Sequence, residues 1–308
     1  MAAASSKLNN RLTEIPAAWN VFFVSILSVG ALITIVPVAL IVIVSFSSKE
    51  SVAELGYTFF PMSWSLEGYD YLFKLGDQLA RSYIVTIQYA VLGTILSVLT
   101  MSLYAYVLAQ PKFPLRKFLT WFMFFTMLFN GGLVTNYILR TRYLNMQDTF
   151  WVLLLNGLAD GFSIIILRTF MKSAVPDSII ESARIDGAGH FRTYMTIVMP
   201  LLKAGLATIG LFGFVMRWND WFTAFLYNSK PALIPLQTML YRMLRQIEFF
   251  INNSELMGTM DALEMLKTLP GVNLRMACTV IVIMPIIFAY PFFQQFFVKG
   301  MLVGSIKE

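Results

Sequence analysis

Residues that could do chemistry gather first in the segment Glu181–Pro200, which reads ESARIDGAGHFRTYMTIVMP between two apolar stretches. Its polar and small residues repeat with helical spacing, so the segment predicts helices that face water. In a chain that is otherwise apolar, such a segment is typical of a surface that contacts a soluble partner. On pattern alone, the alternative is an amphipathic helix that lies at the membrane surface without a partner.

The same segment predicts a helix, a sharp turn and a second helix. The first helix begins in Val175–Ser178, where the S-x-x-E spacing from serine to Glu181 predicts a capping box. Ala183 and Gly187 are four residues apart, so we expect them to share one flat face that another surface can approach closely. Gly187 and Gly189 predict the end of this helix, because glycine adopts left-handed backbone conformations at low cost. The second helix is expected over His190–Met199.

A second polar group, Arg217-Trp218-Asn219-Asp220-Trp221, lies in the outer part of an apolar stretch. Charged and amide groups at membrane depth usually face a cavity or a partner helix. Tryptophan beside an amide and a carboxylate offers a flat apolar face and hydroxyl partners, which is what a sugar needs. The alternative is an interfacial aromatic belt in which Asp220 pairs with Arg217. With two polar residues of the preceding stretch, the candidate substrate path comprises Trp218, Asn219, Asp220, Trp221, Asn156 and Asp160.

The preceding stretch also carries a packing signal. Gly157 and Gly161 have G-x-x-x-G spacing, which predicts a helix face for close packing. Asp160 could line the path, or it could make a structural hydrogen bond to a neighbouring span. No second carboxylate is spaced to form a proton relay with it.

No constellation for catalysis accompanies these residues. The sequence has no Walker A loop, no G-x-S-x-G and no H-E-x-x-H. Cys278 is the one cysteine, which rules out an internal disulfide, and His190 has no cluster of metal-ligating residues around it. We therefore expect a transport subunit, not an enzyme, with no metal or cofactor in this chain and with energy supplied by another protein.

The elements that must position these groups are membrane spans. The 308 residues are 57% hydrophobic and 13% charged, whereas a soluble domain carries about a quarter charged residues. A span needs about 20 apolar residues. Six stretches qualify, and the first is too long for a signal peptide: Val21–Val44, Tyr83–Leu108, Phe118–Tyr137, Phe150–Phe170, Ala204–Phe225 and Arg275–Phe297. The predicted fold class is an all-α integral membrane protein.

Loop charge predicts the orientation. Gln110–Lys117 carries bases and no acid, so it is expected in the cytoplasm, and acid-rich Ser45–Ala80 is expected outside. Six spans then place both termini and the Glu181 segment in the cytoplasm. The predicted organisation is a cytoplasmic segment 1–20, a permease domain 21–298 and a cytoplasmic tail 299–308, with a coupling loop 172–203 and an external loop 226–274. Helical patterning in the external loop covers Met239–Phe250 and Glu255–Leu269.

The spacing in the polar segment resembles the E-A-A-x3-G-x9-I-x-L-P signature of ABC importer permeases, with Ser182 in place of alanine and Met199 in place of leucine. From about Gly132 onward the chain resembles the MalG-like carbohydrate-uptake family, in particular its LplC/YtcP-type branch. The stretches that carry this resemblance are RWNDWFTAFLY at 217–227, PLQTMLYRML at 235–244 and the tail from Tyr290.

The resemblance implies a type I importer fold in which this loop is the coupling helix, seated in a cleft of the ATP-hydrolysing subunit. The residues implied in coupling are Glu181, Ser182, Ala183, Asp186, Gly187, Ala188, Ile197 and Pro200. The implied partners are a second homologous permease, two ATPase subunits that bind ATP and Mg, and an external solute-binding protein. The implied cargo is an oligosaccharide moved into the cytoplasm by alternating access. The alternatives are an importer of a non-sugar cargo, an ATPase-independent secondary transporter and a membrane-embedded enzyme.

Overall fold

The computed structural model describes residues 16–252 and 271–304 of the chain. Within these ranges every regular element is a helix, apart from one isolated bridge between Ser47 and Trp64, which confirms the predicted all-helical class. Contacts divide the described residues into two compact units, one formed by residues 16–71 and 271–280 and the other by residues 72–252 and 281–304.

The smaller unit is organised by a long apolar helix and the turn that follows it. It contains α2 (Ala17–Ser45), α3 (Lys49–Leu55) and the beginnings of α4 (Glu67–Lys74) and α18 (Val272–Gly304). Buried polar contacts tie its parts together. The hydroxyls of Ser45 and Tyr69 lie 2.7 Å apart, and the amide of Asn273 donates to the Ser47 carbonyl at 3.4 Å.

The larger unit contains the helices that position both polar groups. Its long helices are α5 (Asp77–Ala109), α6 (Arg116–Leu128), α9 (Gly161–Ala174), α13 (Lys203–Trp218) and α15 (Leu236–Asn252). Its shorter elements are α7 (Gly132–Ile138), the π-helical turn η1 (Leu139–Tyr143), α8 (Trp151–Leu154), α10 (Asp177–Ile185), α11 (His190–Thr193), the π-helical turn η2 (Tyr194–Val198), α12 (Met199–Leu201), α14 (Phe222–Tyr227) and the 3-10 turn η3 (Pro231–Leu233).

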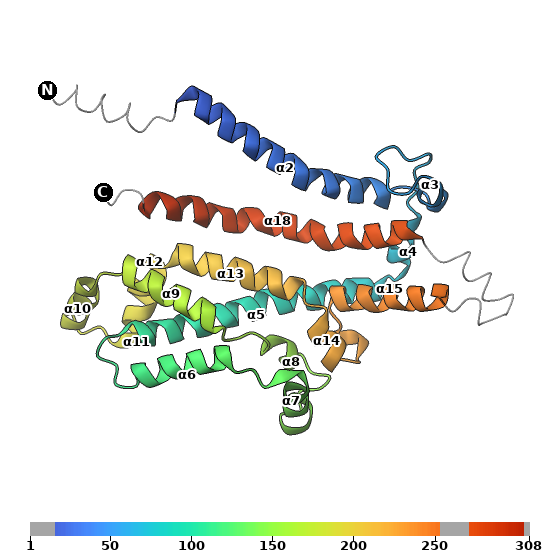
Figure 1. The fold of residues 1–308 in the computed structure, drawn as a ribbon. Coiled ribbons are helices and arrows are strands. Elements are labelled where there is room, and N and C mark those ends of the chain that lie inside the picture. Colours follow the sequence, from blue (N-terminus) through green and yellow to red (C-terminus); the bar gives the residue numbers. More distant parts are fainter. Residues whose placement is uncertain (1–15, 253–270, 305–308) are drawn as a thin grey trace. The chain divides into compact units, whose positions relative to one another are not determined.

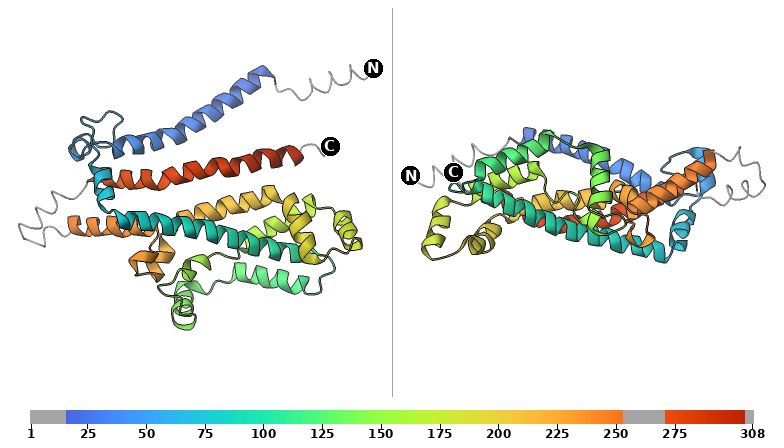
Figure 2. Two further views of the ribbon diagram at one scale, coloured as in Figure 1. Left: turned by 180° about the vertical axis from the view of Figure 1, so that it is seen from behind. Right: turned by 90° about the horizontal axis from the view of Figure 1, so that it is seen from below.

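In this unit α5 is the central helix. It packs against α13 and α9, and α6 packs against α9 and α5 (Figures 1 and 2). One apolar core joins these helices near the end where α10 and α11 lie, and it includes Tyr106, Leu167 and Tyr194. A second core at the other end joins α5 to α8 and α14, and it includes Tyr89, Leu153 and Tyr227. Figure 1 shows the two ends clearly, with α10 and α11 at one and α8 and α14 at the other.

The predicted spans are partly seen as continuous helices. Three helices are long and apolar enough to cross a membrane, at 18–45, 77–109 and 272–291. Two bent pairs qualify if each is one span: α6 with the α7–η1 segment at 112°, and the α11–α12 segment with α13 at 82°. The described residues thus give between three and five spans by length and composition, and they do not establish the predicted six.

Besides Phe118–Tyr137, which bends between α6 and α7, two predicted spans are not single helices. Phe150–Phe170 is broken between α8 and α9, because Gly157 adopts φ +67° and the Asp160 carboxylate accepts a hydrogen bond at 2.8 Å from the Ser163 amide and so caps α9. Ala204–Phe225 is broken after Trp218, where the Asp220 carboxylate accepts from the first amides of α14.

The first break also overturns the predicted G-x-x-x-G face, because Gly157 lies outside any helix. Each glycine nevertheless allows a close approach. A Cβ on Gly161 would lie 2.5 Å from the Met127 side chain, and one on Gly157 would lie 3.3 Å from that of Met216.

In the predicted external loop, Met239–Phe250 is confirmed as helical within α15. The second helix predicted there, Glu255–Leu269, lies outside the described residues, as do residues 1–15 of the N-terminal segment and residues 305–308 of the tail.

Candidate functional site

The polar segment folds as predicted into a helix, a sharp turn and a second helix. α10 begins directly after Pro176 and ends at Ile185. Gly187 then takes φ +77°, and the amides of Gly187 and Ala188 donate to the carbonyls of Arg184 (3.0 Å) and Ala183 (2.8 Å). These two bonds with a left-handed glycine form a Schellman motif, which satisfies the last carbonyls of the helix.

Two details of the predicted first helix are wrong. The capping box does not form, because the helix starts at Asp177 and Ser178 already lies inside it; the Ser178 carbonyl accepts from the Ser182 hydroxyl instead. The flat face shared by Ala183 and Gly187 is also absent. Ala183 is buried against the chain itself, and Gly187 lies beyond the helix end.

The second helix is anchored to the bundle. The predicted helix over His190–Met199 is confirmed as α11, η2 and α12 in succession. Tyr194, fully buried, has its hydroxyl 2.6 Å from that of Ser102 on α5, and its ring lies 5.4 Å from the ring of Tyr106. This contact attaches the segment to the central helix.

The outer side of the segment presents apolar side chains to its surroundings. Ile185 is 86% exposed at the end of α10, and Phe191 is 67% exposed on α11. Of the residues predicted to couple, Glu181, Ser182, Asp186, Gly187 and Pro200 are exposed, Ala188 and Ile197 are half-buried, and Ala183 is buried. The structure thus places most of this set on one accessible helix–turn–helix, while their role in coupling stays a prediction.

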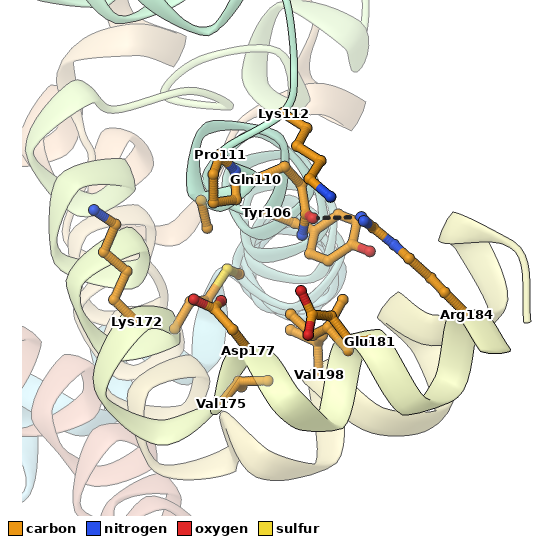
Figure 3. A pocket seen from close by; sticks show the side chains of 13 residues that line it. Tyr106, Gln110, Pro111, Lys112, Lys172, Val175, Asp177, Glu181, Arg184 and Val198 are labelled. Atoms are coloured by element: carbon orange, nitrogen blue, oxygen red, sulfur yellow. Dashed lines mark hydrogen bonds between the residues drawn. The ribbon is translucent and has the colours of Figure 1, made fainter.

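A cavity of about 100 Å³ separates α10 from the end of α5 (Figure 3). Glu181 and Asp177 of α10 and Lys112 of the α5–α6 loop are among the side chains that line it. Across it, Arg184 Nη2 donates to Gln110 Oε1 at 2.9 Å, as the dashed line in Figure 3 marks. This bond links the first helix of the segment to the end of the central helix.

The second polar group forms a buried cluster around Arg217, which is 1% exposed. Arg217 Nη1 donates to the Gly213 carbonyl at 3.1 Å, and Nη2 donates to the carbonyls of Asn156 (3.2 Å) and Gly157 (3.0 Å). The guanidinium therefore satisfies carbonyls that the break between α8 and α9 leaves free. A Cβ on Gly93 of α5 would lie 2.5 Å from Arg217 Nε, so the absence of a side chain there makes room for the arginine.

Around this cluster, polar side chains pair with one another. The Tyr89 hydroxyl donates to Asp220 Oδ2 at 2.8 Å, and Asn156 Nδ2 donates to the Thr223 hydroxyl at 2.9 Å. The other oxygen of Asp220 accepts from the amides of Phe222 and Thr223. Within the described residues no ion pair joins Asp220 to Arg217, so the alternative of that pair is not seen.

The other candidates for the substrate path lie in different surroundings. Trp218 is 2% exposed and donates from Nε1 to the Val282 carbonyl at 3.1 Å. Asn219 is exposed and accepts from Gln237 Nε2 at 3.2 Å, and Trp221 stacks on Tyr241 with ring centroids 4.0 Å apart. Asp160 is exposed and caps α9, away from the buried cluster. The structure joins Asn156 and Asp220 in one cluster and leaves their role in a path untested.

Sequence reasoning missed several contributors. Ile185 and Phe191 are large apolar residues inside a polar segment, and that contrast could have found them. Tyr106, Gln110 and Arg184 are brought together only by the fold. Between residues 16 and 252 and from 271 to 304, no group of three or more histidine, cysteine or acidic side chains could hold a metal ion.

Known proteins resemble this chain over most of its length. No protein-family model matches the chain. It is 35% identical over 277 residues to the polygalacturonan/rhamnogalacturonan transport system permease protein YtcP of Bacillus subtilis (strain 168), covering 90% of this chain and 94% of that protein. It is 34% identical over 307 residues to protein LplC of the same strain, covering 100% of both. Among solved structures, it resembles a chain of a bacterial ABC transporter involved in the import of the acidic polysaccharide alginate. The TM-score is 0.73 at 29% identity, over 91% of this chain and 96% of that one.

Proposed function

Because the chain belongs to the sugar-transport permeases of ABC importers, we propose that its segment 172–203 couples it to a separate ATP-hydrolysing subunit. The protein is a transport component and not an enzyme. The observation that carries the proposal is the exposed helix–turn–helix, closed by the Schellman motif at Gly187 and presenting Ile185 and Phe191 outward. Exposed apolar side chains rimmed by polar ones are typical of a docking surface.

The segment is also built to transmit displacement. Its first helix is joined to α5 through Arg184 and Gln110, and its second through Tyr194 and Ser102. Both links reach the same helix, which packs along α9 and α13. A movement imposed on the segment would therefore reach the centre of the bundle through side chains that are already in contact.

The assembly that follows from this proposal has several partners. A second, homologous permease would complete the pore, and two ATPase subunits would bind ATP and Mg, with no cofactor held by this chain. An external solute-binding protein would deliver the cargo. Alternating access would carry the cargo through six spans with both termini in the cytoplasm, in the plasma membrane of a bacterium.

The proposed cargo is an oligosaccharide derived from a polysaccharide. The names of YtcP and of the alginate transporter support this, since both describe polysaccharide transport. Within the Arg217–Trp221 group, Asn219 is exposed and Trp221 is half-buried, whereas Trp218 is buried and donates to a backbone carbonyl. Uptake of matched neutral and uronic-acid oligosaccharides by the reconstituted transporter would identify the class. Equal uptake of every compound without ATP would favour a secondary transporter. Uptake limited to compounds other than sugars would overturn the proposed oligosaccharide cargo.

Gly187 offers the sharpest test of coupling. A Cβ there would meet nothing within 4 Å, so a substitution acts through the left-handed backbone, which costs non-glycine residues about 1–2 kcal/mol. We expect Gly187→Val to abolish ATP-driven uptake while the protein still inserts and pairs with its partner, and Gly187→Asn to keep much of it. Gly189→Ala is the matched control, because Gly189 has φ −70° and open space around it. Normal uptake by Gly187→Val would reject the coupling role.

A further inference from the structure

A second cavity lies at the connection between α5 and α6, and its lining is basic. It measures about 620 Å³ and is lined by the first residues of α6, the loop before it and one residue of α9. Arg116, Lys117 and Arg168 supply three cations, and none of the lining side chains is acidic. Pro114, Thr120 and Trp121 are among the other lining residues.

The three cations lack anionic partners in the part of the chain that the structure describes. No hydrogen bond or ion pair from their side chains is seen there, and Arg168 Nε is buried without an acceptor. Like charges that share a cavity repel one another, so this arrangement is costly unless an anion enters. The start of α6 adds to the positive potential, because Leu115 provides no side-chain cap for its first amides.

The surface that continues from the cavity is apolar and aromatic. Along α6, Phe118, Trp121, Phe122 and Phe125 are 64%, 75%, 54% and 56% exposed, and their spacing places them on one face. Trp121 belongs both to this face and to the cavity lining. A basic recess at the end of an apolar helix face is complementary to a phospholipid, whose head group would fill the recess and whose acyl chains would lie along the helix. Tryptophan at the boundary matches the membrane interface.

We propose that this cavity binds the phosphate of an anionic phospholipid, held by Arg116, Lys117 and Arg168, with the acyl chains along the exposed face of α6. Basic pockets between membrane helices are suited to such head groups. Arginine offers a fork of donors that matches phosphate oxygens, and lysine adds a point charge. The site is distinct from the coupling surface and from the substrate path, so it goes beyond the proposed transport function.

Lipid retention by the assembled transporter tests this inference. The complex is purified from nanodiscs that contain phosphatidylglycerol or phosphatidylcholine with the same acyl chains, and bound lipid is counted by native mass spectrometry. We expect phosphatidylglycerol to be retained preferentially. Each cation near an anionic head group contributes about fivefold in affinity. Lys117→Gln should therefore weaken retention about fivefold and Arg116→Gln/Arg168→Gln about 25-fold.

Lys117 is exposed, so Lys117→Gln keeps the test valid if the double variant fails to fold. Lys112→Gln is the matched control, because it removes a charge from the loop just before α6, while Lys112 lines the other cavity. Equal retention of the two lipids, or equal losses in Lys117→Gln and Lys112→Gln, would overturn the proposal. Displacement of the lipid by millimolar inorganic phosphate would also overturn the proposal, because the cavity would then be a site for a free anion. Retention of the lipid only when the ATPase is absent would overturn it as well, because an acidic protein surface would then be the occupant of the cavity.

Discussion

The proposed coupling segment, residues 172–203, and the Arg217 cluster both place charged residues in an apolar chain, yet they stabilise them in opposite ways. The coupling segment is shaped by its own backbone, through the Schellman motif at Gly187, and it leaves Glu181 and Asp186 exposed. The cluster is shaped by side chains that reach across the bundle, and it buries Arg217 almost completely. The first region is therefore suited to meeting a partner, and the second to fixing helices.

The difference also concerns distance along the chain. The bonds that close α10 join residues three and five positions apart, from Gly187 to Arg184 and from Ala188 to Ala183. Those of the cluster join residues 61 positions apart in Arg217–Asn156 and 131 apart in Tyr89–Asp220. Perturbing the first region should change transport with little loss of stability, whereas perturbing the second should change stability first.

The largest expected effect is at Arg217. Arg217→Met removes the donors to the carbonyls of Asn156 and Gly157 and leaves those acceptors without a partner. Both hydrogen bonds are partly buried, and an acceptor left unpaired away from water costs about 1–3 kcal/mol. We expect the free energy of unfolding to fall by about 3 kcal/mol, as measured by denaturant unfolding in detergent. Unchanged stability would show that the cluster does not fix the helices.

The fit between Gly93 and Arg217 gives the next largest effect. Gly93→Ala places a Cβ 2.5 Å from Arg217 Nε and forces the arginine to shift, at a cost of about 2 kcal/mol. In an Arg217→Ala background the same methyl group has room, so Gly93→Ala should cost much less there. Additive effects in this double-mutant cycle would contradict the proposed fit.

A smaller effect is expected at the link between α10 and α5. Arg184→Ala removes its hydrogen bond to Gln110, which is worth about 1 kcal/mol when partly buried. We expect the ratio of sugar imported to ATP hydrolysed to fall about fivefold, with the free energy of unfolding lowered by no more than about 1 kcal/mol. Gln110→Ala should lower this ratio by the same factor, and the double variant should lower it no further. A double variant in which the two single effects add in full would exclude a shared bond.

The smallest effect is a dependence on pH at the other end of the bundle. The Asp148 carboxylate accepts hydrogen bonds from the amides of Ser229 and Lys230, and these bonds hold the pKa of Asp148 below its usual value of about 3.9. A lowered pKa in the folded state stabilises the loop above that usual value, and the contribution is lost as the pH falls through the folded-state pKa. The protection of the Ser229 and Lys230 amides from hydrogen exchange, relative to their intrinsic exchange rates at each pH, should therefore fall below about pH 4, and Asp148→Asn should remove the change. Asparagine tolerates the φ of +54° found there, so a pH change that persists in Asp148→Asn would point to another group.

How well the sequence predicts each region depends on how far apart in the sequence its interacting residues are. The helix, turn and helix at 177–201 were predictable, because proline, glycine and helical spacing act within a few residues. The inward direction of Ala183 was not, since it depends on packing against the bundle. The breaks at Gly157 and Asn219 were also missed. An apolar run predicts burial, but only the distant Arg217 supplies the donors that let the backbone open at Asn156 and Gly157.

The central claim is that the end of α10 contacts the ATPase. Cys278 is buried, so Ile185→Cys would place a single exposed cysteine in the chain at a position where isoleucine is 86% exposed. In the assembled transporter we expect Ile185→Cys to cross-link to the ATP-binding subunit through a short bifunctional reagent, and Tyr143→Cys, at a 76% exposed site near the other end of the bundle, to give no such product. Cross-linking from Tyr143→Cys alone, or from neither position, would contradict the account.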